Sequence, residues 1–116
     1  MIHLEPAGAE ALLLVLAEKP DAALPPRIAW LAERVRQALG ERVVDLVPGM
    51  TSLLIHYDLL RCDQQSLATR LTPLLEEWMA LQAVTAAQAR LHELPVCYDG
   101  DDLLAVAQAC RLTVDE

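Results

Sequence analysis

The sequence contains no phenylalanine, and aromatic residues of all kinds make up only 3% of its 116 positions. Hydrophobic residues nevertheless account for 54% of the chain, mostly as Leu, Ala and Val. This proportion is far above that of a disordered protein, so we expect an aliphatic core. A chain of 116 residues can bury one such core but cannot hold two complete domains.

Basic residues are scarce, because nine Lys and Arg stand against seventeen Asp and Glu and give a formal charge of -8. Such a surface repels phosphates on average, so we expect neither nucleic acid nor a membrane as a partner. No apolar run approaches the ~20 residues that span a bilayer. The start of the chain also lacks the basic and apolar segments of a signal peptide, and we predict a cytoplasmic protein.

Residues that bind metals, phosphates or disulfide partners do not occur in their usual spacings. The three cysteines include no CxxC pair, which favours reduced, structural thiols. The four glycines are isolated from one another, which excludes P-loop and dinucleotide-binding loops. His3, His56 and His92 form no HExxH-like pattern. The sequence therefore predicts neither a metal site nor a cofactor site.

Hydrophobic patterning predicts two β-hairpins, each followed by a helix. The first hairpin joins residues 2–5 to 11–16, and the second joins residues 42–47 to 52–57. In the last of these strands Leu53, Ile55 and Tyr57 share one apolar face, which should meet the helices. The predicted fold class is α+β, with a two-layer ββαββα domain over residues 1–80 whose antiparallel sheet carries both helices on one face.

The two helices have clear boundary signals. Pro25 and Pro26 indicate the start of the first helix, and Gly40 indicates its end. Asp63 is suited to cap the second helix, in which Pro73 removes a backbone donor and should cause a bend.

Residues 81–116 are predicted to form a linker, a strand and a third helix. The Ala- and Gln-rich stretch 80–89 gives no clear assignment, whereas residues 90–98 are typical of an extended segment in which Pro95 indicates an edge position. Asp102 is suited to cap a helix that starts at Leu103. Residues 113–116 match the capping box Ser/Thr-x-x-Glu, so we expect a further helix to follow them.

The residues alone identify no active site. Asp99, Asp101 and Asp102 lack the alternating acids and distal Glu of a calcium loop and are suited to a turn and a cap. Cys97 lies in an apolar segment, where a thiol is usually inert. Ser52 lacks the G-x-S-x-G elbow of a nucleophilic serine. Composition and spacing favour a binding or interaction domain.

Three collinear segments resemble a known family. Residues 45–58 (DLVPGMTSLLIHYD) resemble the "V-P-x-x-x-S-L-L-V-x-Y-D" hairpin of the B-type 5-oxoprolinase subunits, a family also called KipI or allophanate hydrolase subunit 1. Residues 94–98 (LPVCY) are similar to its "I-P-V-x-Y" strand, and residues 102–107 (DLLAVA) to its "D-L-x-x-V-A" helix start. The turn at residues 99–101 is shorter than the family's Gly-rich loop, and residues 112–116 stop within its "G-L-T/S-x-x-E/D" motif.

The resemblance implies a DCoH-like amino-terminal domain, with residues 81–116 leading to a missing cyclophilin-like second domain. It also implies a heteromeric complex with the C-type and A-type subunits of 5-oxoprolinase, which hydrolyses 5-oxo-L-proline to L-glutamate with ATP. Related members carry the carboxyltransferase-domain label. Because the family's functional residues lie in the second domain, we expect this fragment to bind no cofactor and to be inactive alone, while the parent complex binds ATP.

The positions that match the family's motifs are candidate motif or interface positions, and none is assigned a catalytic role. They are Pro48, Ser52, His56, Asp58, Pro95 and Asp102. The alternative function is a regulatory module, because one branch of the family inhibits a sensor histidine kinase. A third hypothesis is a hydrolase that uses Cys97 or Ser52. The substrate of the parent protein stays open among 5-oxoproline, allophanate and other lactams or ureides.

Overall fold

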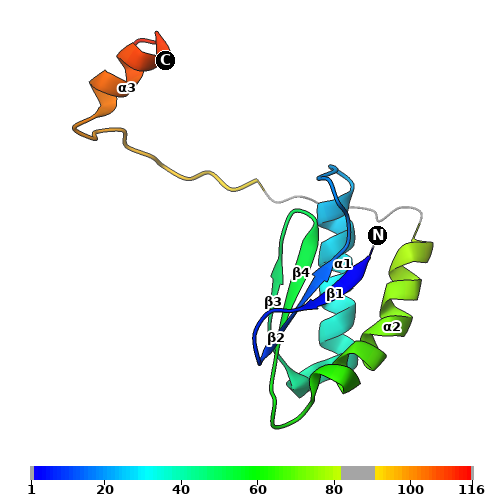
Figure 1. Cartoon of the computed structure of the whole chain (residues 1–116). Helices are drawn as coiled ribbons and strands as arrows, with labels where there is room; N and C mark the ends of the chain where they lie inside the picture. The colour runs from blue at the N-terminus through cyan, green and yellow to red at the C-terminus, as the bar shows by residue number, and fades with distance from the viewer. Residues whose placement is uncertain (1, 82–90, 116) are drawn as a thin grey trace.

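A computed structural model of the chain describes residues 2–81 and 91–115. Its elements are β1 (His3–Pro6), β2 (Ala11–Val15), α1 (Leu24–Leu39), the short 3₁₀ turn η1 (Gly40–Arg42), β3 (Val43–Pro48), β4 (Ser52–Tyr57), α2 (Gln64–Ala80) and α3 (Leu103–Cys110). The strands form one antiparallel sheet in the order β1-β2-β4-β3. Figure 1 shows α1 and α2 on the same side of this sheet. The α+β class and the ββαββα order are confirmed.

The core lies between the sheet and the two helices, because alternate residues of the central strands point toward the helices. Leu12 of β2 lies opposite Ile55 of β4, and Leu14 lies opposite Leu53. All four side chains are buried. Tyr57 is buried on the same face, as the alternation of apolar residues predicted. The helices contribute further buried residues to this cluster, among them Ile28, Leu31 and Val35 of α1 and Leu67, Leu71 and Trp78 of α2.

The boundaries of the helices follow the predicted signals. Pro25 and Pro26 lie in the first turn of α1, and Gly40 ends that helix with a φ of 52°, where a side chain would be strained. The Asp63 side chain accepts a hydrogen bond of 2.7 Å from the Ser66 amide, which confirms the predicted cap. Pro73 lies inside α2, and the bend expected there stays a prediction.

A reciprocal contact between Arg27 and Trp78 joins the two helices, in addition to the Arg34–Glu77 ion pair. The Arg27 guanidinium lies over the Trp78 indole, with Cζ 4.1 Å from the ring centroid. Arg27 Nη2 donates a hydrogen bond of 3.0 Å to the Trp78 main-chain oxygen, and Trp78 Nε1 donates one of 3.2 Å to the Arg27 main-chain oxygen. This contact ties the first part of α1 to the last turn of α2.

The second part of the chain departs from two predictions. Residues 91–100 form no strand, because no described residue pairs with them and their side chains are exposed. Asp102 occupies the position before α3, but its backbone is already helical and its side chain makes no capping bond. Residues 82–90 and Glu116 lie outside the described residues, and with them most of the 80–89 stretch and the end of the capping box.

Residues 2–81 supply the whole hydrophobic core cluster, and α3 lies apart from the two-layer body in Figure 1. Within the described ranges, none of the helices combines the length and the apolar character that crossing a membrane requires.

Candidate functional site

The turn that follows β4 is organised by Asp58, the last residue of the hairpin motif. One carboxylate oxygen, Asp58 Oδ1, accepts a hydrogen bond of 2.9 Å from the Leu60 amide, and the Asp58 main-chain oxygen accepts bonds of 3.0 Å from the Arg61 and Cys62 amides. The Asp58 amide donates to the Arg42 main-chain oxygen at 3.0 Å. Asp58 therefore shapes the turn as an Asx-type residue and fastens it to the start of β3.

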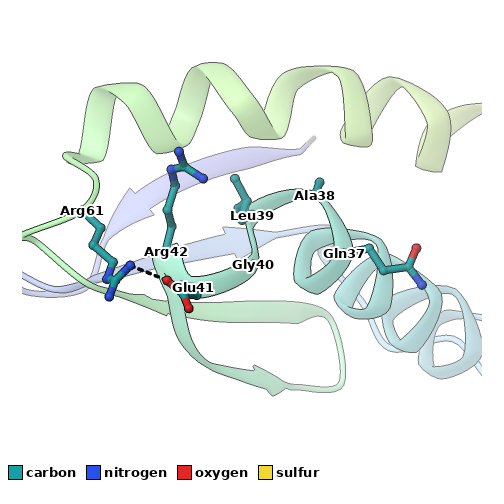
Figure 2. A pocket seen from close by; sticks show the side chains of 7 residues that line it. All are labelled: Gln37, Ala38, Leu39, Gly40, Glu41, Arg42 and Arg61. Carbon is teal, nitrogen blue, oxygen red and sulfur yellow. Dashed lines mark hydrogen bonds and ion pairs between the residues drawn. The ribbon is translucent and has the colours of Figure 1, made fainter.

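Arg61 in this turn is held by two carboxylates. Arg61 Nη1 lies 2.5 Å from Glu41 Oε2, and Arg61 Nε lies 3.3 Å from Asp58 Oδ2. Figure 2 shows the Arg61–Glu41 pair beside the end of α1, while the Arg42 side chain extends the other way, toward α2. Because all these groups are at the surface, the ion pairs contribute little stability and mainly fix side-chain positions.

A hollow of about 490 Å³ lies on this side of the turn (Figure 2). It is lined by Gln37, Ala38, Leu39, Gly40, Glu41, Arg42 and Arg61. Arg42 has no ion-pair partner among the residues that the structure describes, so the hollow presents one uncompensated positive charge beside a neutralised one. Its lining includes no Ser, Cys or His side chain.

A second hollow, of about 510 Å³, lies on the other side of the same turn. It is lined by Glu10, Val44, His56, Tyr57, Asp58, Leu59 and Leu60. His56 Nε2 lies 3.6 Å from Glu10 Oε2, and both side chains are partly exposed. Tyr57, which lines this hollow, is held in place because its buried side chain donates the hydroxyl hydrogen to the Ala9 main-chain oxygen at 3.0 Å.

Val44 enters this hollow because of an irregularity in β3. The register shifts between Val43, which pairs with Tyr57, and Asp45, which pairs with His56. Val44 is the extra residue of this bulge and is exposed. Bulges often redirect a side chain at the edge of a sheet in this way.

The six sequence-predicted positions do not converge on one site. His56 and Asp58 line the same hollow. Pro48 and Ser52 flank the turn at the opposite end of the hairpin, where the Gly49 amide donates to the Ser52 main-chain oxygen at 2.7 Å. Pro95 is exposed in the segment without secondary structure, and Asp102 precedes α3.

The geometry gives no support to nucleophilic chemistry by Ser52. Ser52 and His56 are four residues apart on β4, which separates them by about 13 Å along the strand. A general base must lie within hydrogen-bond reach of the proton it removes. Cys97 is exposed, and within residues 2–81 and 91–115 no three His, Cys, Asp or Glu residues are grouped so that they could hold a metal ion.

Sequence reasoning missed most of the residues around the Asp58 turn. Glu10 reaches it only through the pairing of β2 with β4, whereas Glu41 and Arg42 lie at the start of the predicted second hairpin, which brings them beside Asp58. Arg61 could have been found, because it lies three residues after Asp58 and carries the opposite charge.

The described residues thus form an α+β domain with two hollows beside the charged Asp58 turn. The chain is a member of the family described as carboxyltransferase domain, subdomain C and D, which matches residues 2–116. This membership is consistent with the resemblance to KipI and the B-type 5-oxoprolinase subunits. No curated protein matches the chain.

A solved structure is also similar, that of the conserved uncharacterized protein PH0987 from Pyrococcus horikoshii. The two proteins share 28% sequence identity with a TM-score of 0.57, and the match covers 97% of this chain and 51% of the other. The present chain thus spans about half the length of that relative.

Proposed function

We propose that this chain is a non-catalytic domain of a protein similar to the B-type subunit of 5-oxoprolinase. In this proposal it acts with C-type and A-type partner subunits in the ATP-dependent hydrolysis of 5-oxo-L-proline to L-glutamate. The observation that carries the proposal is the set of collinear motifs from Asp45 to Ala107, within a chain that matches the carboxyltransferase-domain family over residues 2–116. ATP and substrate belong to the complex rather than to this chain.

The geometry of the described residues supports an assembly role. Ser52 and His56 are too far apart to act together, and Arg61 is already neutralised by Glu41 and Asp58. The surface of the chain has two hollows beside the Asp58 turn and a segment with exposed apolar side chains. Surfaces of this kind bind other polypeptides more readily than they transform small molecules.

Residues 91–115 are the proposed arm toward a further domain of the parent protein. Leu94, Val96 and Tyr98 alternate along the segment and are 80%, 64% and 78% exposed. In a strand these three side chains would share one face, which residues 2–81 do not cover. Packing of this face against a cyclophilin-like domain would bury it.

The test is reconstitution of the complex from the A-type and C-type partners and a parent protein that contains this chain. ATP-dependent release of glutamate is measured with the intact parent protein and with a version that lacks residues 1–80. We expect a loss of at least about tenfold without these residues, because assembly positions the reacting groups. Full activity of the shortened protein would refute the proposal.

Two controls separate this function from the other hypotheses. Ser52→Ala and Cys97→Ala should each leave glutamate release unchanged, whereas a large loss in either variant would support a hydrolase. The alternative regulatory role is measured by adding the chain to a sensor histidine kinase during autophosphorylation. Inhibition there, together with unchanged glutamate release, would favour the regulatory function.

A further inference from the structure

One face of the sheet has no helix over it among the described residues. Antiparallel neighbours that lie directly opposite each other point to the same side. The register pairs Glu5 with Leu13, Leu13 with Leu54, and Leu54 with Val47. These residues therefore form a row across all four strands on the side away from α1 and α2. We call this side the open face.

The open face is apolar along its centre. Leu13 and Leu54 are only partly buried, and Val47 is 49% exposed, whereas Leu12, Leu14 and Leu53 on the opposite face are buried. The row from Leu13 to Val47 crosses three strands and is therefore about 10 Å wide, at about 4.8 Å per strand. This width matches the diameter of one α-helix, about 10 to 12 Å.

The formally charged residues of the open face are acidic, and His3 on the same face lies with its Nε2 2.6 Å from Glu5 Oε1. The four strands contain no Lys or Arg, and their acidic residues are Glu5 and Asp45. Glu10 precedes β2 and lies beside His56, which shares a row with Ala11 and Asp45. An occupant of this face must therefore supply the positive charge.

A second copy that docked through its own open face, through residues 91–115 or through the arginines of α1 would not supply that charge. A second copy that used the same face would place Glu5, Glu10 and Asp45 against their equivalents. The segment 91–115 is acidic too, with five Asp and Glu residues and a single Arg. On α1 the exposed Arg34 and Arg36 are already paired with Glu77 and Glu33, so they are poor counterions for a second copy.

We propose that the open face binds an amphipathic α-helix of another protein, with aliphatic side chains over Leu13, Leu54 and Val47 and with Arg or Lys beside Glu10 and Asp45. A helix on this side would complete a three-layer arrangement and remove the exposed apolar row from water. The inference does not depend on the proposed enzymatic complex, because it rests only on the sheet.

The experiment uses the full chain and a fluorescent 18-residue helical peptide made of Leu, Ala and Arg. A second peptide carries Glu in place of each Arg. Binding is measured by anisotropy at low and moderate salt, and the chain's oligomeric state by sedimentation. We expect the Arg peptide to bind a monomeric chain, the Glu peptide not to bind, and affinity to fall as salt rises.

Variants locate the binding surface. The double variant Glu10→Gln/Asp45→Asn should weaken binding about fivefold through loss of two favourable charges, and Val47→Ser should weaken it about threefold through loss of apolar contact. Matched controls on α2 are Glu76→Gln and Met79→Ser, which make the same kinds of change on exposed residues elsewhere. These controls should keep the original affinity.

The proposal is overturned if the Arg peptide does not bind, or if the α2 controls weaken binding as much as the open-face variants. It is also overturned if the chain is a stable dimer whose formation is abolished by Val47→Ser, because a second copy would then be the occupant. Equal binding of the Glu peptide would show that basic side chains of the helix do not determine binding, and it would refute the proposed partner.

Discussion

The contact between Arg27 and Trp78 allows a sharp test of how α1 and α2 are held together. Both of its hydrogen bonds end on main-chain oxygens, which every variant retains. Only the stacking of the guanidinium on the indole requires both side chains at once. A double-mutant cycle with Arg27→Met and Trp78→Leu therefore isolates the stacking energy from the hydrogen bonds.

We expect a coupling energy of about 1 kcal/mol, within the range of about 0.5 to 2 kcal/mol for cation–π contacts from exposed to desolvated sites. Trp78→Leu alone should lower the free energy of unfolding by about 2 to 4 kcal/mol, because Trp78 is only 4% exposed and a smaller side chain leaves a cavity. Arg27→Met should cost less, about 1 kcal/mol. Its lost hydrogen bond is partly offset by the removal of Arg27 Nε, which is buried without a hydrogen-bond partner among residues 2–81 and 91–115.

The assay is urea unfolding of the four proteins, followed by circular dichroism and evaluated with a common slope. A coupling energy below about 0.3 kcal/mol, the usual error of additivity, would refute the stacking contribution. If Arg27→Met lowered the free energy of unfolding as much as Trp78→Leu does, removal of the buried Arg27 Nε would not offset the lost hydrogen bond. A changed slope in either single variant would show that the denatured state, and not the contact, had changed.

Further substitutions test the local arguments by the same unfolding assay. Asp63→Ala should cost about 1 kcal/mol through loss of the α2 cap, and an unchanged midpoint would contradict that role. Gly49→Ala should cost about 1 to 2 kcal/mol, because its Cβ would lie 2.7 Å from Ser52 Oγ. Adding Ser52→Ala should recover most of the lost stability. If stability is not recovered, the destabilisation comes from the backbone and not from the contact with Ser52 Oγ. Leu53→Ala should cost about 2 to 5 kcal/mol, whereas Leu60→Ala, at a fully solvated position, should cost less than about 0.5 kcal/mol.

The two-layer body could be predicted from the sequence because its signals are local and agree with one another. The strand expected at residues 52–57 has those bounds in the structure. Every second residue of this strand is apolar and buried, so the sequence pattern marks the strand directly. The helix expected from Pro25 to Gly40 begins only one residue earlier, because Pro and Gly act on the backbone directly. Asp63 caps α2 through a bond that spans three residues.

The environment of the Asp58 turn could not be predicted in the same way. The Arg61–Glu41 pair joins positions 20 residues apart, and the contact of Tyr57 with Ala9 spans 48 residues. The pairing of β2 with β4 brings Ala9 to Tyr57, and the pairing of β3 with β4 brings Glu41 to Arg61. Sequence patterns indicate which residues face the core, but not which polar residues of distant segments meet at a sheet end.

The strand predicted at residues 90–98 is not formed by the described residues 91–98, and the reason differs from that for the Asp58 turn and bears on function. Its alternation of Leu94, Val96 and Tyr98 is the pattern of a half-buried strand, yet a strand also needs a neighbour for its backbone hydrogen bonds. The described residues provide no such neighbour, and the three side chains are left exposed. Pattern and structure therefore differ here although the alternation is clear, because the alternation alone supplies no hydrogen-bonding neighbour. Hydrogen exchange of the Val96 and Tyr98 amides should be fast in the isolated chain and slow in the parent protein. Equal rates in the two would show that this segment is a linker whose alternation carries no structural meaning.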